Sequence, residues 1–406
     1  ANEYRTREVL DKYCSFMPTE IYLVNETAEP EYETILPEEK TDKDTVIETI
    51  IEDAKTEEKE NENGEKEIVE VSPRTEKLKI LKRPVPINDP HPLWTKHPNE
   101  CSDEDYKEFY RNVFHDYKEP LFWIHLNMDY PFNLKGILYF PKINMEYESI
   151  EGTIKLYNNQ VFIADNIKEV IPEFLMLLKG VIDCPDLPLN VSRSALQNDG
   201  FVKKISDYIT KKVADKLTGM CKTDRETYEK YWDDIAPFIK FGCLKDQKFA
   251  EKMDDYIIYK NLDGKYLTLK DCMDKAKEEG HENQIYYVTN EKEQSQYINM
   301  FKANGQDAII MSHSIDNPFI SQEEQKHENL KFLRIDADVN DTLREEVKEE
   351  DKEALKKQEE TLTETFKKAL GDDKLQVKVE KLKDAEISSM ITLSEETRRM
   401  QDMMKM

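Results

Sequence analysis

Residues 183–200 read DCPDLPLNVSRSALQNDG, and the rest of the chain is organised around this stretch. Residues 167–180, just before it, place apolar side chains at helical spacing, which predicts an amphipathic helix that ends at Gly180. Val181 and Ile182 then predict a short buried strand. The stretch therefore begins at the end of a strand, and two prolines stiffen the loop that follows.

This loop presents one arginine and one glutamine in a defined arrangement. Either Asn190 or Ser192 can cap a helix that starts near residue 192, because both side chains accept from free N–H groups of the first turn. Arg193 falls in that first turn and Gln197 lies four residues later, so both project from one face. Such a pair suits an anionic oxygen that arrives from outside. Spacing alone favours the plainer interpretation, a solvated surface pair.

Two long stretches resemble the heat-shock protein 90 chaperone family in its bacterial form. Residues 156–197, LYNNQVFIADNIKEVIPEFLMLLKGVIDCPDLPLNVSRSALQ, are similar to its middle domain, as are residues 91–126, HPLWTKHPNECSDEDYKEFYRNVFHDYKEPLFWIHL. In that family the arginine of an N-[VL]-S-R loop reaches toward the γ-phosphate of ATP, and the glutamine one turn later assists. The resemblance therefore implies catalytic roles for Arg193 and Gln197, with Asn190 as a looser member of the loop.

The resemblance also implies a fold and a domain organisation. We expect an α/β (α+β) chain with two layered αβα domains, followed by the start of an α+β C-terminal dimerisation domain. The expected domains are residues 1–220, with an acidic insertion at 26–75, then residues 221–337, then a truncated part at 338–406. The chain opens with Ala1 and enters a helical pattern directly, so we expect a segment of a longer protein.

In the intact family member, ATP and magnesium are bound by an N-terminal domain, so the resemblance implies no cofactor and no metal within these residues. The implied partners are client polypeptides and a second copy of the chain, without nucleic acid or membrane. Five residues are candidate client contacts: Trp94, Phe319, Met400, Met403 and Met404. Each has an alternative as a core residue, since a lone tryptophan is often a core anchor and clustered methionines are often core filler.

Composition limits the class of protein. The net charge of −26 argues against nucleic acid binding, which requires a basic face. The six cysteines form no C-x-x-C pair and have no histidine at metal-ligand spacing, which is typical of reduced thiols in a cytoplasmic protein. No apolar run approaches the roughly 20 residues of a membrane span.

Half of the net charge lies in one segment. Residues 26–70 hold eighteen acidic side chains against five lysines, a net charge of −13, which predicts an insertion that cannot bury a core. Within it, residues 46–51 and 67–71 are compatible with short strands or a hairpin. Just before it, residues 19–24 predict a strand.

The remaining pattern alternates strands and helices. Ser102 caps a predicted helix, strands are predicted at 121–128 and 134–140, and residues 201–220 predict a long helix. Alternation over residues 266–336 predicts a second, smaller α/β unit with a partly parallel sheet and no phosphate-binding glycine loop. A charged helix is predicted for residues 338–368, and a half-buried strand is predicted for residues 375–382.

The residues alone lead to a cytosolic, multi-domain α/β protein. Two other classes of function remain at this point. An acidic scaffold or adaptor without ATP-linked activity agrees with the composition. A self-contained hydrolase has little support, because no G-x-S-x-G or H-E-x-x-H motif and no Cys/His nucleophile arrangement is present.

Overall fold

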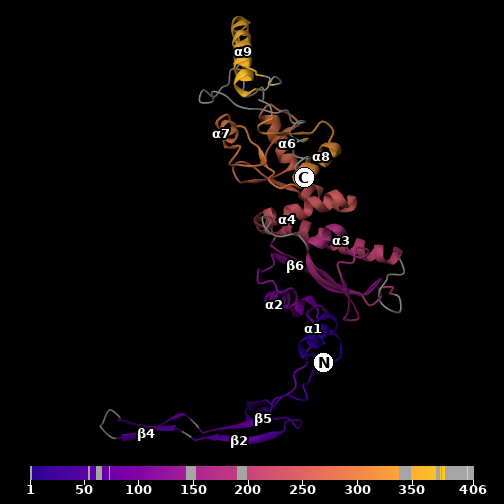
Figure 1. The fold of residues 1–406 in the computed structure, drawn as a ribbon, viewed down its shortest axis with the longest axis vertical. Helices are drawn as coiled ribbons and strands as arrows, with labels where there is room; N and C mark the ends of the chain where they lie inside the picture. Colours follow the sequence, from indigo (N-terminus) through magenta and orange to yellow (C-terminus); the bar gives the residue numbers. More distant parts are fainter. Residues whose placement is uncertain are drawn as a thin grey trace.

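The computed structural model shows a mixed α/β chain whose elements follow one another along an elongated molecule (Figure 1). The residues that it describes are 2–53, 55–60, 66–72, 74–142, 152–189, 199–337, 349–371, 375, 377–379 and 400.

A five-stranded mixed sheet forms the centre of the larger unit. Its strands, in the order in which they lie side by side, are β6 (Phe122–Met128), β7 (Leu134–Phe140), β10 (Lys179–Asp183), β8 (Ile154–Asn158) and β9 (Val161–Asp165). Strand β10 runs antiparallel to β7 and parallel to β8. The middle strands are apolar on both sides, as expected for a sheet that is covered on two faces.

Helices cover both faces and make three layers. One face of the sheet packs against the helices α3 (Asp199–Thr223), α4 (Arg225–Lys245) and α5 (Gln247–Met253). The other face packs against α2 (Asp103–Phe114) and the short helix η2 (Leu93–Thr95). This is the layered αβα arrangement that the sequence predicts.

Two predicted helices of the larger unit are confirmed. Ser102 caps α2 through a reciprocal pair of hydrogen bonds with Asp105. In α3, the side chains of Ile205, Ile209 and Val213 are fully buried at the predicted helical spacing.

The predicted helix at 167–180 is wrong. The chain there makes a turn and a short 3-10 helix, η4 (Glu173–Leu177), and Gly180 lies inside β10. Its apolar side chains are buried as predicted, but they enter the core from a turn, where Phe174 packs on Phe249 with ring centroids 4.9 Å apart. A Cβ at Gly180 would lie 2.7 Å from the Ile137 carbonyl oxygen, so this glycine permits close strand pairing.

The acidic insertion forms strands and contributes one side chain to a small core. The strands β1 (Tyr32–Ile35) and β2 (Val46–Glu52) both pair with β5 (Thr75–Leu81), and β3 (Lys55–Glu60) pairs with β4 (Lys66–Ser72). Ile35 is the only member of the acidic segment in the small buried cluster, which it forms with Leu78 and Ile80 from the strand that follows the segment. Figure 1 shows this sheet at one end of the molecule, apart from the larger unit.

Residues 19–24 do not form the predicted strand. The segment has no regular secondary structure. Its Ile21 N–H donates to Asn88 Oδ1, and its Ile21 carbonyl oxygen accepts from the Ile87 N–H. These contacts pair it with a loop, which satisfies its backbone without a sheet.

The smaller unit is confirmed as α/β with a parallel sheet. Strand β13 (Gln284–Val288) lies between β14 (Ile309–Ile310) and β15 (Lys331–Arg334), and both pairings are parallel. The other elements are β11 (Ile258–Lys260), β12 (Tyr266–Thr268), α6 (Leu269–Glu278), α7 (Ser295–Ala303) and α8 (Asp316–Lys326). The larger core continues through α4 and α5 into this unit, and the domain boundaries remain predictions.

Beyond the smaller unit, the structure describes the helix α9 (Glu349–Leu370), in the region of the predicted charged helix. Leu375 and residues 377–379 are not in a strand, so for these described residues the strand prediction is wrong. Among the described residues, no helix is long and apolar enough to cross a membrane.

Candidate functional site

The described chain leads to the predicted arginine loop through a short stem, residues 184–189, which follows β10. The side chain of Asn158, the last residue of β8, donates from Nδ2 to the carbonyl oxygens of Cys184 and Pro185, both at 3.0 Å. On the other side, the N–H of Asn133 donates to Asp186 Oδ2 at 2.7 Å. Two separate segments of the larger unit thus hold the stem.

A buried carboxylate lies directly before the stem. Asp183 is 6% exposed, and its Oδ2 accepts from Trp94 Nε1 at 3.3 Å and from the Gln160 N–H at 3.0 Å. Burial raises the pKa of Asp183. The two hydrogen bonds lower it, but burial has the larger effect, so the pKa lies above its usual value. The Gln160 side chain in turn donates to the carbonyl oxygens of Phe16 and Pro90. The end of β10 is therefore connected to three separate segments.

The three predicted catalytic residues, Asn190, Arg193 and Gln197, lie outside the described residues. The stem ends at Leu189, one residue before Asn190. The structure therefore describes how the chain is held up to the loop, and the roles of the three residues remain predictions.

Two of the predicted client contacts are corrected, because both side chains are core residues. Trp94 is 1% exposed and packs against the rings of Phe16, Phe109 and Tyr157. Phe319, on α8, is fully buried. Large aromatic side chains gain much from burial, and the core was the alternative that the sequence left open for both residues.

Met400 is the one predicted client contact that the described residues leave accessible, with 54% of its surface exposed. Met403 and Met404 lie outside the described residues. The three methionines therefore remain candidates for a contact surface.

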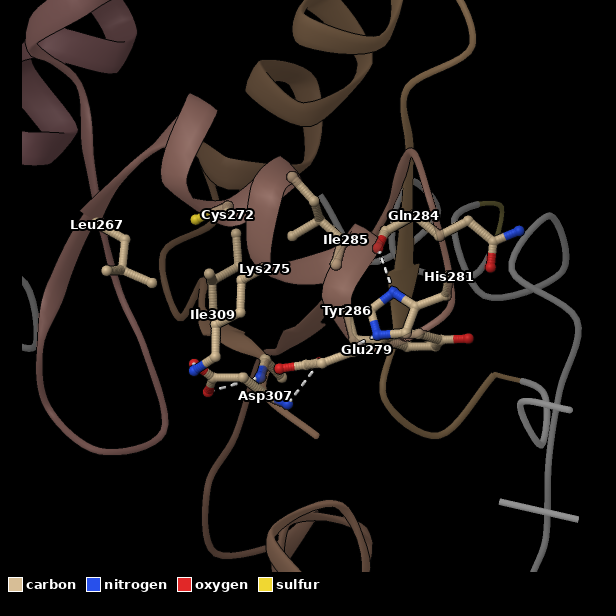
Figure 2. A pocket seen from close by; sticks show the side chains of 12 residues that line it. Leu267, Cys272, Lys275, Glu279, His281, Gln284, Ile285, Tyr286, Asp307 and Ile309 are labelled. Carbon is tan, nitrogen blue, oxygen red and sulfur yellow. Dashed lines mark hydrogen bonds and ion pairs between the residues drawn. The ribbon is translucent and has the colours of Figure 1, made fainter. Parts of the chain in front are cut away.

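The smaller unit contains a small pocket that sequence reasoning missed (Figure 2). It lies between the end of α6 and the strands β13 and β14, and the side chains that line it include Cys272, Lys275, Glu279, His281 and Asp307. Its volume of about 20 Å³ holds roughly one water molecule. No sequence motif marks it, because the pocket forms only when three elements meet.

Hydrogen bonds in this pocket favour a protonated histidine. Nδ1 of His281 faces the Gln284 carbonyl oxygen at 2.8 Å, and Nε2 faces Glu279 Oε2 at 3.1 Å. Since both partners are acceptors, both ring nitrogens must donate, which requires the imidazolium. Burial alone lowers the pKa of His281, but the hydrogen bonds to Glu279 and Gln284 outweigh it and raise the pKa above its usual value.

The thiol in the pocket is not poised for chemistry. Burial raises the pKa of Cys272 to about 12, so it remains a thiol at neutral pH. Lys275 pairs with Asp307, which also accepts from the Leu262 N–H and the Asn261 side chain. These contacts join α6 to β14, and we interpret the pocket as a polar anchor.

Comparison with known proteins identifies the family. A sequence model described as Hsp90 protein matches residues 1–406. The chaperone protein HtpG of Bacteroides thetaiotaomicron is 44% identical over 326 residues, which cover 78% of this chain and 48% of that protein. HtpG of Porphyromonas gingivalis is 42% identical over 329 residues, which cover 78% of this chain and 47% of that protein.

Among solved structures, the middle domain of a Plasmodium falciparum heat shock protein is similar, with 24% identity and a TM-score of 0.47. The match covers 61% of this chain and all of that one. The chain spans about half the length of the curated relatives that it matches. Because the family model matches from the first residue to the last, this chain belongs to the Hsp90 protein family.

Proposed function

We propose that this chain is the middle segment of an ATP-driven molecular chaperone that binds unfolded or partly folded proteins. Two findings support the proposal: the chain belongs to the Hsp90 family, and its relatives are named chaperone proteins. In the proposed intact protein, which is a homodimer, ATP and magnesium are bound by a domain outside these residues. The acidic scaffold without ATP-linked activity is the outcome that the experiment below must exclude.

The observation that carries the catalytic part is the anchored stem. Asn158 and Asn133 hold residues 184–186 by four hydrogen bonds, and the LNVSR motif begins three residues later, at Leu189. A loop on a fixed stem needs little reorganisation to bring a side chain to a phosphate. Positioning increases a reaction rate because the catalytic group needs little rearrangement to reach the transition state.

In this proposal Arg193 stabilises negative charge on the γ-phosphate in the transition state, after the chain and the nucleotide domain close on each other. The guanidinium presents several donors in a fixed planar fork, which suits phosphate oxygens. Gln197 adds a neutral donor one turn later. Because both contacts form only on closure, they lower the barrier of hydrolysis without tightening the binding of ATP.

The test compares the ATP turnover and the ATP affinity of the full-length protein with those of its Arg193→Ala variant. We expect turnover to fall by up to about 10³-fold, or by less if closure limits the rate, while ATP affinity stays unchanged. Gln197→Ala should act in the same direction but more weakly. Arg111→Ala is the matched control, because Arg111 is a surface residue of α2 that pairs with Glu104.

The opposite pattern would contradict the proposal. If Arg193 only pairs with a nearby carboxylate, Arg193→Ala lowers the melting temperature and leaves the turnover unchanged. If the full-length wild-type protein itself hydrolyses no ATP, the scaffold alternative stands.

A further inference from the structure

Three potential metal ligands meet in the smaller unit, and none of them lines the pocket of Figure 2. Glu323 and His327 lie one turn apart at the end of α8, and Asp254 begins the short helix η5 (Asp254–Tyr256). One ligand atom of each residue lies within 4.8 Å of the other two. Helical i, i+4 spacing brings the first two together, and the packing of α5 and η5 near α8 adds the third.

The environment of this triad leaves two buried polar atoms without partners. Nε2 of His327 is buried, has no hydrogen-bond partner among the described residues, and lies 3.8 Å from Glu323 Oε2. The hydroxyl of Tyr259 is likewise buried without a partner, and Tyr259 is 2% exposed. Burial is the main cause of the raised pKa of Tyr259, and the negative charge of Glu323 raises it further. Buried polar atoms without partners are rare, and an ion with its water ligands supplies what they lack.

The triad already binds one cation, which comes from its own helix. Nζ of Lys326 lies 2.9 Å from Glu323 Oε1 and 3.6 Å from Asp254 Oδ1. Glu323 is 1% exposed, whereas the Lys326 side chain is 30% exposed. A buried carboxylate requires a positive partner, but a partly exposed lysine can move into solvent when another cation replaces it.

We propose that Asp254, Glu323 and His327 form a site for a divalent transition-metal ion of the zinc class. The donor set of one imidazole nitrogen and two carboxylate oxygens is one that zinc accepts, with water completing the coordination. Magnesium and calcium prefer oxygen ligands alone, so the imidazole selects against them. The ion displaces the Lys326 ammonium and links α8 to the α5–η5 segment. This inference is independent of the proposed ATP-linked function.

The test is titration of the purified chain with ZnCl₂ by calorimetry, and with CoCl₂ followed by its visible absorption. We expect one ion per chain and a rise in melting temperature with zinc. His327→Ala and Glu323→Gln should each weaken binding by more than about tenfold. Lys326→Met should strengthen it, because the competing ammonium is gone.

The Lys326→Met result is decisive, since a simple ion-pair cluster predicts no gain in metal affinity. His91→Ala is the matched control, because it removes one exposed imidazole elsewhere. Zinc binding that survives both ligand substitutions but disappears after thiol alkylation would place the ion on cysteines and overturn the proposal. Absence of binding to the folded wild type and to Lys326→Met would also overturn it, as would equal binding of MgCl₂.

Discussion

Nε1 of Trp94 donates a hydrogen bond of 3.3 Å to Oδ2 of Asp183, joining residues 89 positions apart in the sequence. Both side chains are buried, and Asp183 is the last residue of β10 before the stem of the arginine loop. Trp94 thus stabilises the end of β10, from which the stem of the arginine loop starts. This role differs from the client contact that the family resemblance implied.

Replacing this tryptophan should destabilise the larger unit. Trp94→Phe removes the indole donor and part of the packing against Phe16 and Tyr157, and leaves Asp183 with fewer partners. We expect a loss of about 2–3 kcal/mol in the free energy of unfolding, measured by urea denaturation. Trp123→Phe is the control, because Trp123 is only half-buried and stacks on Tyr106. Equal losses for the two variants would show that the Asp183 contact contributes nothing of its own.

The histidine of the smaller unit should make stability depend on pH. The folded pKa of His281 is raised above the usual value of 6.5, so the folded state binds its proton more tightly than the unfolded state. Its contribution is fully present below pH 6.5 and is lost as the pH rises through the raised value. The free energy difference between wild type and His281→Gln should therefore shrink between pH 6 and pH 8.

The measurement is urea unfolding of both proteins at several pH values. Comparing the two proteins removes the opposite effect of His125 and His313, whose pKa values are lowered, mainly by burial. A constant difference across this range would contradict the assignment of the imidazolium.

A buried ion pair should be indispensable to the smaller unit. Nζ of Lys240 on α4 lies 2.5 Å from Asp316 Oδ1 at the start of α8, and the two residues are 3% and 1% exposed. Lys240→Met leaves a buried carboxylate that keeps contacts only with His313 among the described residues, through its N–H and its imidazole, and should cost about 3–5 kcal/mol. The double variant with Asp316→Leu should lose less than the two single variants together. Additive losses in this double-mutant cycle would exclude a coupled pair.

The stem makes a prediction that rests on the proposed function. Asn158→Ala removes both hydrogen bonds to the carbonyl oxygens of Cys184 and Pro185. In the full-length protein we expect ATP turnover to fall by up to about 100-fold with little change in ATP affinity, because a misplaced loop loses its transition-state contacts. Asn133→Ala keeps its backbone bond to Asp186 and should have a smaller effect.

Arg193→Ala provides the reference for this experiment. If Arg193→Ala lowers turnover and Asn158→Ala does not, the stem has no positioning role. If neither variant lowers turnover, the loop itself is not catalytic.

The final methionines remain the candidate client surface. Replacing Met400, Met403 and Met404 with Ser should weaken the suppression of aggregation of a model client protein. Met400 is 54% exposed, and exposed positions contribute little to stability, within about 0.5 kcal/mol each. The melting temperature should therefore stay near that of the wild type. A large fall would mean that these methionines are core residues, and full protection of the client would exclude them as contacts.

How much of this molecule the sequence predicts depends on the range of the interactions involved. The cap at Ser102, the strands β6 and β7, and the face of α3 with Ile205 and Ile209 follow from neighbouring residues, so the pattern of apolar and polar side chains predicts them. The parallel sheet of the smaller unit follows likewise from alternating strands and helices. The loop motif at Asn190–Arg193–Gln197 is also readable in the sequence, through its likeness to a family.

The tertiary structure decided the features that depend on contacts between distant residues. The apolar spacing of 167–178 suits a helix, but the chain there makes a turn and a 3-10 helix before it enters β10, which pairs closely with β7. Trp94 and Phe319 lost their assigned surface roles because partners from other elements enclose them. Two groups of charged side chains come together only where separate elements meet. One is His281 with Glu279 and Asp307, and the other is Asp254 with His327. Local patterns specify which side chains seek burial, while the free energy of packing distant segments decides where each one is buried and what it contacts.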